Sequence, residues 1–329
     1  MVDATAPIAA SAAPSRGFLR ANALPLALLF ILAVVGFAAP LIGEAYVLNL
    51  VTRIMIFAIA ALALDLLVGY GALVSFGHAA FIGLGAYAVG ILAAHGINDA
   101  LVQLPLALGS SALFAFATGI VCLRTRGVYF IMITLAFGQM AFFTASSLAP
   151  YGGDDGLTIP MRSTFAGVAV FAGDRSLYSL ALVCLAGAWL MCRALVASRF
   201  GRVYRGAREN AARISAIGFD VFRFQLAAYV IAGMLAGLAG FLLANATDFV
   251  SPAYMAWQRS GDLLIMVILG GMGTLHGAII GAAVFLLTEE WLSGMTEHWK
   301  VIFGPLLVLV ALYARGGLIG LALRLRRTV

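Results

Sequence analysis

Ser75 and His78 are the two side chains of this sequence that come nearest to a catalytic pair, because they lie close together in the glycine-rich stretch of residues 69–90. A serine and a histidine act as nucleophile and base only when a third, acidic group orients the base, and the neighbouring sequence offers none. The chain also contains no HExxH, GxSxG or CxxC motif. We therefore interpret both side chains as hydrogen-bond partners of a backbone segment that interrupts a helix. An intramembrane hydrolase is the weakest of the three functions that we consider for this sequence.

Few ionisable groups interrupt the apolar runs. Arg53, Asp65 and Asp262 are candidates for ion coupling, but each stands near the end of a run, so we expect them at the membrane interface rather than deep in the membrane. The chain has no GxxxxGK[ST] motif and does not bind ATP through a P-loop. If transport is active, another polypeptide supplies the energy. No cofactor or metal site is expected, because the three cysteines, Cys122, Cys184 and Cys192, show no metal-ligand spacing.

Glycines interrupt a second apolar run, residues 263–287, at the sequence GGMGT of residues 270–274. Irregular backbone at membrane depth is tolerated only where protein or a polar cavity surrounds it, so both interruptions indicate a pathway. The short patterns HAAFIG (78–83) and HGAIIG (276–281) are also similar, as in internally repeated secondary carriers. An ion-coupled secondary transporter is therefore the main alternative. The predicted translocation path comprises Ser75, Gly77, His78, Gly270, Gly271, Gly273 and His276.

The elements that must position these residues are membrane-spanning helices. The sequence is 63% hydrophobic and 10% charged, which leaves too little polar surface for a soluble protein of this length. Apolar runs of about 20 residues without alternation predict helices rather than a β-barrel. We predict an all-α polytopic membrane protein with about eight full transmembrane helices and a broken segment near 263–287. The full spans are expected at 23–42, 47–68, 79–94, 101–123, 128–148, 177–196, 224–246 and 301–314.

The distribution of arginines predicts the orientation of these spans. Arg124, Arg126, the segment 199–223 and the basic tail of residues 321–329 should be cytoplasmic. We also expect both termini to be cytoplasmic. Basic residues then lie on the cytoplasmic side, as the positive-inside rule requires, only if the segment 263–287 forms a re-entrant hairpin of two half-helices that enters from outside and returns. The predicted organisation is a disordered cytoplasmic tail (1–22), one transmembrane domain (23–320) with a cytoplasmic loop at 198–223 and a periplasmic loop at 149–176, and the basic cytoplasmic tail.

The arginine-rich loop is amphipathic and not merely charged. At 100° per residue, a helix over residues 202–217 places Val203, Ala207, Ala211, Ile214 and Ile217 on one side and most of the charged residues on the other. Retention of a loop in the cytoplasm needs charge alone, so the apolar face indicates a docking surface. No aromatic residues alternate with the arginines as base-stacking platforms would require, and nucleic-acid binding is therefore not expected.

Several separated motifs resemble those of one transporter family. They are GY (69–70), SFGHAAF (75–81), GAY (85–87), GGDDGL (152–157), REN (208–210) running to Gly218, AGLAG (236–240) and LGGMGT (269–274). In this order, from about residue 46 to residue 320, the chain resembles the permease subunits of ATP-binding-cassette importers for branched-chain amino acids, of the LivM type. It departs from the pattern at Ala72 and Ala278, where relatives often have glycine and proline.

The resemblance implies an importer in the bacterial inner membrane. Its expected partners are a homologous second permease subunit, two cytoplasmic ATPases, a periplasmic substrate-binding protein and membrane lipid. The arginine-rich loop is similar to the coupling helix that enters a groove of the ATPase, although its glycine lies farther from its alanines than in the commoner form. The coupling residues expected on this basis are Arg205, Arg208, Glu209, Ala211, Ala212 and Gly218. Similar permeases serve branched-chain amino acids, urea, short amides or aromatic acids, and the sequence does not choose among them.

Overall fold

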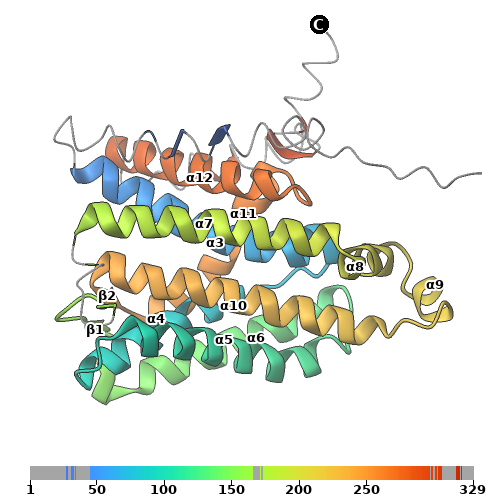
Figure 1. Cartoon of the computed structure of the whole chain (residues 1–329), viewed down its shortest axis with the longest axis horizontal. Coiled ribbons are helices and arrows are strands. Elements are labelled where there is room, and N and C mark those ends of the chain that lie inside the picture. Colours follow the sequence, from blue (N-terminus) through green and yellow to red (C-terminus); the bar gives the residue numbers. More distant parts are fainter. Residues whose placement is uncertain are drawn as a thin grey trace, which may run out of the picture.

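A computed structural model describes residues 45–165 and 173–296 without interruption, together with residues 27, 28, 31, 32, 34, 171, 298, 301, 303–305, 316–318 and 320. The predicted tails (1–22 and 321–329) and most of the predicted first and last spans (23–42 and 301–314) lie outside the described residues. The described part is a helical bundle (Figure 1). It confirms an all-α polytopic membrane protein, whose only described strands are two residues long.

Among the described residues, six helices are long and apolar enough to cross a membrane. They are α3 (Ala45–Gly71), α5 (Ala100–Cys122), α6 (Val128–Ser147), α7 (Asp174–Ala197), α10 (Val221–Thr247) and α12 (Leu275–Met295). The shorter helices are α4 (His78–Ala94), α8 (Arg199–Glu209), α9 (Ala211–Ala216) and α11 (Trp257–Gly270). One-turn 3-10 helices cover Ala149–Tyr151 and Pro252–Met255, and β1 (Leu157–Thr158) pairs antiparallel with β2 (Phe249–Val250).

One predicted full span is a short helix in the structure, and the predicted broken segment is longer than expected. The predicted full span at 79–94 is the 17-residue helix α4, which at 1.5 Å per residue is shorter than the hydrocarbon layer. The predicted hairpin of two half-helices is instead a 14-residue α11 followed by a 21-residue α12, and α12 is long enough to cross. It continues past residue 287, where the predicted segment ended, to Met295. In this extension the hydroxyl of Tyr46 donates to Glu290, and Arg53 lies 3.9 Å from Glu289.

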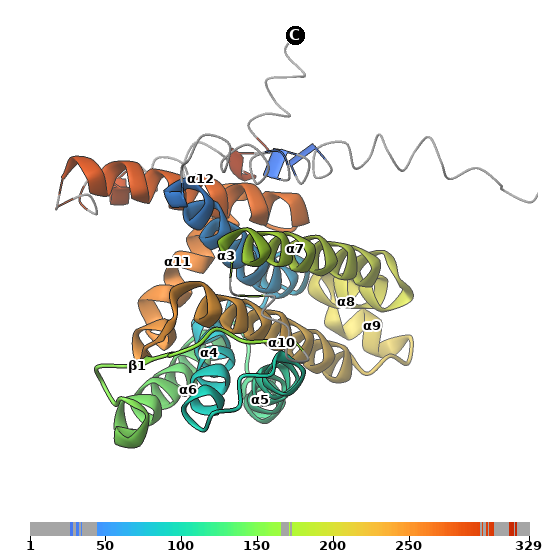
Figure 2. The same ribbon diagram turned by 60° about the vertical axis from the view of Figure 1, so that its left-hand side comes forward.

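Helices α3 and α10 form the centre of the bundle. About 72% of the apolar window of α3 and 67% of that of α10 is buried within the protein, against 22–28% for α5, α6 and α7. The three outer helices therefore leave most of their apolar side chains uncovered by the described part of the chain. Figure 2 shows α3, α7 and α10 side by side, with α11 between α12 and α4.

Close glycine packing brings these helices together. A Cβ atom on Gly233 of α10 would lie 2.7 Å from Cβ of Ala115 on α5, and one on Gly281 of α12 would overlap the backbone of Met266 on α11. The sequence has GxxxG spacing at 233–237 and at 277–281, and both pairs lie at sites of close helix approach.

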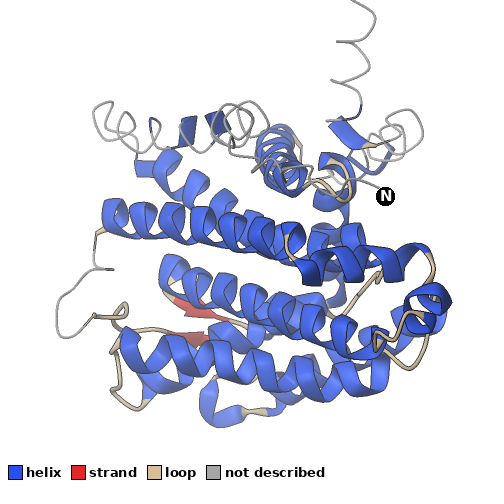
Figure 3. Ribbon diagram, turned by 45° about the vertical axis from the view of Figure 1, so that its right-hand side comes forward, coloured by secondary structure: helices blue, strands red, loops and turns tan. Residues whose placement is uncertain are grey.

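The bundle has two distinguishable ends. The two short strands lie at one end, here called the strand end, and α8 and α9 lie at the other, here called the arginine-rich end (Figures 1 and 3). At the strand end Arg162 donates to Asp248 (3.0 Å) and to Asp174 (2.8 Å). Burial alone would lower the pKa of Arg162, but these two hydrogen bonds outweigh it and raise the pKa. The network ties the loop after α6 to the ends of α7 and α10.

Candidate translocation and coupling site

The first break in the bundle is the non-helical stretch of residues 72–77 between α3 and α4. The N–H groups of Ala72 and Leu73 still bond to carbonyls of α3, whereas those in the second half of the break and at the start of α4 bond to side-chain hydroxyls. The bonds run from Phe76 to Thr134 on α6 (3.2 Å), from Gly77 to Ser75 (3.3 Å) and from Ala79 to Ser260 on α11 (3.0 Å). Three neutral side chains from three parts of the chain therefore hold the first break.

Ser75 and His78 are both fully buried at this break. The Ser75 hydroxyl accepts from the Gly77 N–H, whereas neither ring nitrogen of His78 has a hydrogen-bond partner. The His78 ring packs edge-on against Phe81 at a centroid distance of 5.3 Å. The two side chains do not form a nucleophile–base pair, which removes the geometry that an intramembrane hydrolase needs.

The second break is the turn of residues 271–274 between α11 and α12. Gly271 and Gly273 adopt φ angles of +117° and +76°, a region that favours glycine. The hydroxyl of Thr274 donates to the Gly271 carbonyl (2.6 Å), and the Gly273 N–H donates to a carboxylate oxygen of Asp65 (2.7 Å). His276 is half-buried, unlike the fully buried His78, so the two histidines that suggested a repeat have different surroundings.

Asp65 lies inside the bundle, and the expectation of an interfacial helix-end residue is wrong. Its side chain is 0% exposed, and it bonds to Gly273, which is 208 residues away in the sequence. One carboxylate oxygen accepts this bond and the other has no hydrogen-bond partner. The signal available in the sequence was an aspartate within an apolar run, which marks a functional candidate. The sequence does not indicate that Gly273 is the hydrogen-bond partner of this aspartate.

The arginine-rich segment forms two helices, whereas a single helix over 202–217 was predicted. Asn210 separates α8 from α9 with an extended backbone (φ −154°, ψ 96°), and its side chain accepts from the Arg213 N–H at 2.9 Å. Asparagine is among the preferred residues for this N-cap role, and this favours a new helix start over continuation. Arg205 donates to the carbonyls of Gly201 and Val196 rather than pairing with Glu209.

Helix α8 packs on the end of α3, just before the first break. The guanidinium of Arg208 donates to the carbonyl of Gly69, and the buried ring of Tyr204 lies directly against Gly71, where a Cβ atom would overlap its hydroxyl. Gly69 in turn lies against Gly273 of the second break. We call the set Asp65, Gly69, Arg208 and Gly273 the junction. It connects α8 to the last turn of α3, directly before the first break, and to the second break.

The other predicted coupling residues form an exposed tip. Arg205, Glu209, Ala212 and Gly218 are exposed, and Ala211 is half-buried. Ile217 and Phe219 beside them are 64% and 42% exposed. The tip therefore combines small, acidic and large apolar side chains on a surface that nothing in the described part of the chain covers. Arg208 is exposed too, but it also bonds inward to Gly69.

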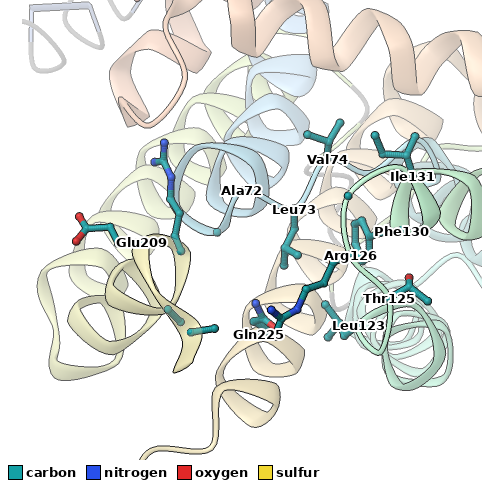
Figure 4. Close-up of a pocket in the computed structure, with 15 residues that line it drawn as sticks. Ala72, Leu73, Val74, Leu123, Thr125, Arg126, Phe130, Ile131, Glu209 and Gln225 are labelled. Carbon is teal, nitrogen blue, oxygen red and sulfur yellow. The ribbon is translucent and has the colours of Figure 1, made fainter. Parts of the chain in front are cut away.

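A cavity of about 320 Å³ opens next to the junction. It is enclosed by the first break, the loop between α5 and α6, and the starts of α6 and α10, with the end of α8 at its edge. Figure 4 shows Arg126 and Gln225 directed toward its centre, while Glu209 points away from it. A conformational change at the first break would change the shape of this cavity directly.

Comparison with known proteins identifies the family. A model of the branched-chain amino acid transport system permease component matches residues 46–311. The chain belongs to this family. The permease is 29% identical to the high-affinity branched-chain amino acid transport system permease protein LivM of Salmonella typhimurium, over 88% of this chain and 74% of the relative. It is 30% identical to the Escherichia coli LivH protein of the same system, over 37% of this chain and 40% of that relative.

Another relative is named for a different import system. The autoinducer 2 import system permease protein LsrC of an Enterobacter species is 30% identical over 63% of the permease and 60% of its own length. No solved structure gives a significant match. Membership in a family of permease components makes the chain a multi-pass transport subunit and not an enzyme.

Proposed function

We propose that the permease is a transmembrane subunit of an ATP-driven importer for branched-chain amino acids in the bacterial inner membrane. Its partners are a second, homologous permease subunit, two cytoplasmic ATPases and a periplasmic substrate-binding protein. The similarity to both LivM and LivH supports a pathway formed by two related subunits. The lightly buried faces of α5, α6 and α7 suit contact with lipid.

The arginine-rich end faces the cytoplasm in this proposal, and the strand end faces the periplasm. The arginines of α8 and α9 and those of the loop after α5 lie at the same end, in agreement with the positive-inside rule. Helices α11 and α12 form a pair that begins and ends at the strand end, because Glu289 and Glu290 at the end of α12 contact the start of α3. This arrangement supports the re-entrant character of α11, and it agrees with the prediction that both terminal tails are cytoplasmic.

The observation that carries the proposal is the junction. The exposed tip at Glu209, Ala212 and Gly218 offers an ATPase a surface to bind. Arg208 on the same helix holds the Gly69 carbonyl, and Asp65 holds the second break. A displacement of α8 by an ATPase therefore acts on both irregular segments, one of which borders the cavity. The ATPase thus binds at the tip, and the junction transmits the displacement of α8 to the two irregular segments.

Substitutions at the tip test this role. We expect Glu209→Ala and Gly218→Ala, introduced together, to lower ATP-driven uptake at least about tenfold, because the pair removes a charged contact and strains a residue at φ +96°. Membrane insertion should be unchanged, since no atom lies within 4 Å of a Cβ at position 218. Uptake is measured in proteoliposomes that contain the whole importer, and ATPase retention is measured by co-purification.

Arg199→Ala is the matched control, since Arg199 is exposed at the other end of α8. Its uptake should equal that of the unmodified permease. Transport by this chain alone, driven by a proton or sodium gradient and sensitive to Asp65 or His78 replacement, would instead establish the ion-coupled carrier. Uptake that continued without any ATPase would contradict the proposal.

A further inference from the structure

A second cavity lies at the strand end of the bundle, away from the junction. Its volume is about 260 Å³, close to the lower end of the range for small-molecule sites. We call it the outer cavity. Side chains from α3, α4, α10, α11 and the 3-10 helix before α11 enclose it, namely Arg53, Phe57, Ile82, Leu243, Thr247, Tyr254 and Arg259.

Two arginines in a mainly apolar cavity are its unusual feature. Arg53 comes from the first turns of α3 and Arg259 from the start of α11, so the cavity receives a positive charge from each of two helices. Phe57 lies beneath the Arg53 guanidinium, whose central carbon is 5.9 Å from the ring centroid. This cation–π contact holds the guanidinium in place without using its hydrogen-bond donors.

Both arginines have loosely placed acidic partners. Arg53 is 3.9 Å from Glu289, and Arg259 is 3.5 Å from Asp262 in its own helix. A charge-assisted hydrogen bond normally measures 2.7–2.9 Å, and Arg162 at the same end makes such bonds of 2.8 and 3.0 Å. Arg162 is thus committed to its network, whereas the donors of Arg53 and Arg259 remain available to an incoming anion.

We propose that the outer cavity binds the carboxylate of the transported solute between Arg53 and Arg259, with the solute's aliphatic side chain against Phe57, Ile82 and Leu243. This inference rests on the proposed function, because it takes the strand end as the side from which solute arrives. An adjoining cavity shares Arg53, Leu243 and Thr247 and extends between α3 and α10 toward Tyr46. It provides a route into the site.

The chemistry of the site selects a substrate class. A planar guanidinium binds a carboxylate through two parallel hydrogen bonds. Urea and short amides are neutral and gain no charge attraction there. With urea or an amide bound, Glu289 and Asp262 would remain the strongest partners of the two arginines. The outer cavity therefore favours aliphatic amino acids over urea and amides.

Uptake kinetics with paired substrates test the proposal. The whole importer is reconstituted with leucine as the probe, and leucinamide is the competitor that lacks a carboxylate. We expect Arg53→Gln and Arg259→Gln each to raise KM for leucine at least about tenfold, since each removes a charged hydrogen-bond donor, with a smaller change in kcat. Arg53→Lys keeps the charge and should recover part of the loss. Leucinamide should compete weakly with every form.

Arg175→Gln is the control, because Arg175 is exposed near the start of α7 at the same end and does not line the cavity. If Arg53→Gln fails to fold because Glu289 loses its partner, the double variant Arg53→Gln, Glu289→Gln replaces it, and the same rise in KM is expected.

ATP-driven leucine uptake with an unchanged KM in these variants would overturn the inference and leave the proposed function standing. Efficient uptake of leucinamide or urea would also overturn it. Absence of ATP-driven uptake by the unmodified importer would instead reject the proposed function.

Discussion

The two breaks in the bundle differ in how their backbone groups are satisfied. The first break uses the neutral hydroxyls of Ser75, Thr134 and Ser260. The second uses the carboxylate of Asp65 and two glycines with positive φ. A net hydrogen bond between neutral groups contributes about 0.5–1.5 kcal/mol, and one to a charged group about 1.5–3 kcal/mol. The strongest single bond is thus the one from the Gly273 N–H to Asp65 at the second break.

This difference suggests separate roles for two segments that look alike in the sequence. The first break forms a wall of the cavity at the arginine-rich end, and its hydroxyl partners can exchange at modest cost. The second break is attached to α3 through Asp65, and α3 is attached to α8 through Arg208. We infer that the first break changes conformation during transport and that the second transmits the displacement.

Asp65→Ala should have the largest effect, because it removes the charged acceptor of the second break and leaves the Gly273 N–H unpaired. We expect the free energy of unfolding to fall by about 3 kcal/mol and uptake to be nearly lost. Asp65→Asn keeps an oxygen acceptor and should lose less than half as much stability. Thermal unfolding of the purified permease in detergent, together with uptake by the whole importer, measures both effects.

Asp155→Ala serves as the comparison, since Asp155 is an exposed loop residue and its replacement should change stability by less than about 0.5 kcal/mol. An Asp65→Ala protein as stable as the unmodified permease would show that the second break does not depend on its carboxylate. The proposed difference between the breaks would then be wrong.

Ser260→Ala addresses the first break and should have an intermediate effect. The Ser260 hydroxyl accepts from the Ala79 N–H in the first turn of α4, where helix N–H groups lack internal partners. Its loss leaves a buried donor unsatisfied at a cost of about 1–2 kcal/mol. Uptake should fall less than in Asp65→Ala, because the junction remains intact. Thermal unfolding and uptake are measured as before.

Ser293→Ala is the control for Ser260→Ala, because its hydroxyl also bonds to a backbone group, here donating to the Glu290 carbonyl, but on an exposed turn of α12. It should be close to neutral. A destabilisation by Ser260→Ala as large as that by Asp65→Ala would remove the distinction between hydroxyl-held and carboxylate-held breaks.

Local sequence signals predicted the elements of this fold better than their connections. Apolar runs located α3, α5, α6, α7 and α10 to within a few residues, and glycines located both breaks. The length of α12 was missed because Glu289 and Glu290 look like loop residues until α3 is placed beside them. Long-range partners determine such helix ends, and one sequence does not contain them.

The same limit applies to the candidate site. Exposure of Glu209 and Gly218 agrees with the predicted docking tip, and their role in coupling stays a prediction. The inward bond of Arg208 to Gly69 joins residues 139 positions apart, and no local pattern indicates it. The start of α9, however, could have been predicted from the sequence, because asparagine is a preferred N-cap residue and Asn210 occupies that position. The predicted single helix over 202–217 relied on the apolar periodicity alone.

Ala72→Gly should give the smallest effect, and in the opposite direction. Ala72 opens the first break at φ +55°, a conformation that costs a residue with a Cβ atom about 1–2 kcal/mol. Glycine removes this cost but gives the unfolded chain more freedom, so we expect a net gain of about 0.5–1 kcal/mol. Ala72 is exposed, and the change sacrifices little packing. At the helical, exposed position 194 the matched change Ala194→Gly should instead cost about 1 kcal/mol. The second break already has glycine at both of its positive-φ positions, so this gain exists only at the first. If Ala72→Gly lowered the thermal midpoint as Ala194→Gly does, the strain assigned to the first break would be absent, and the break would be as firmly specified by its backbone as the second.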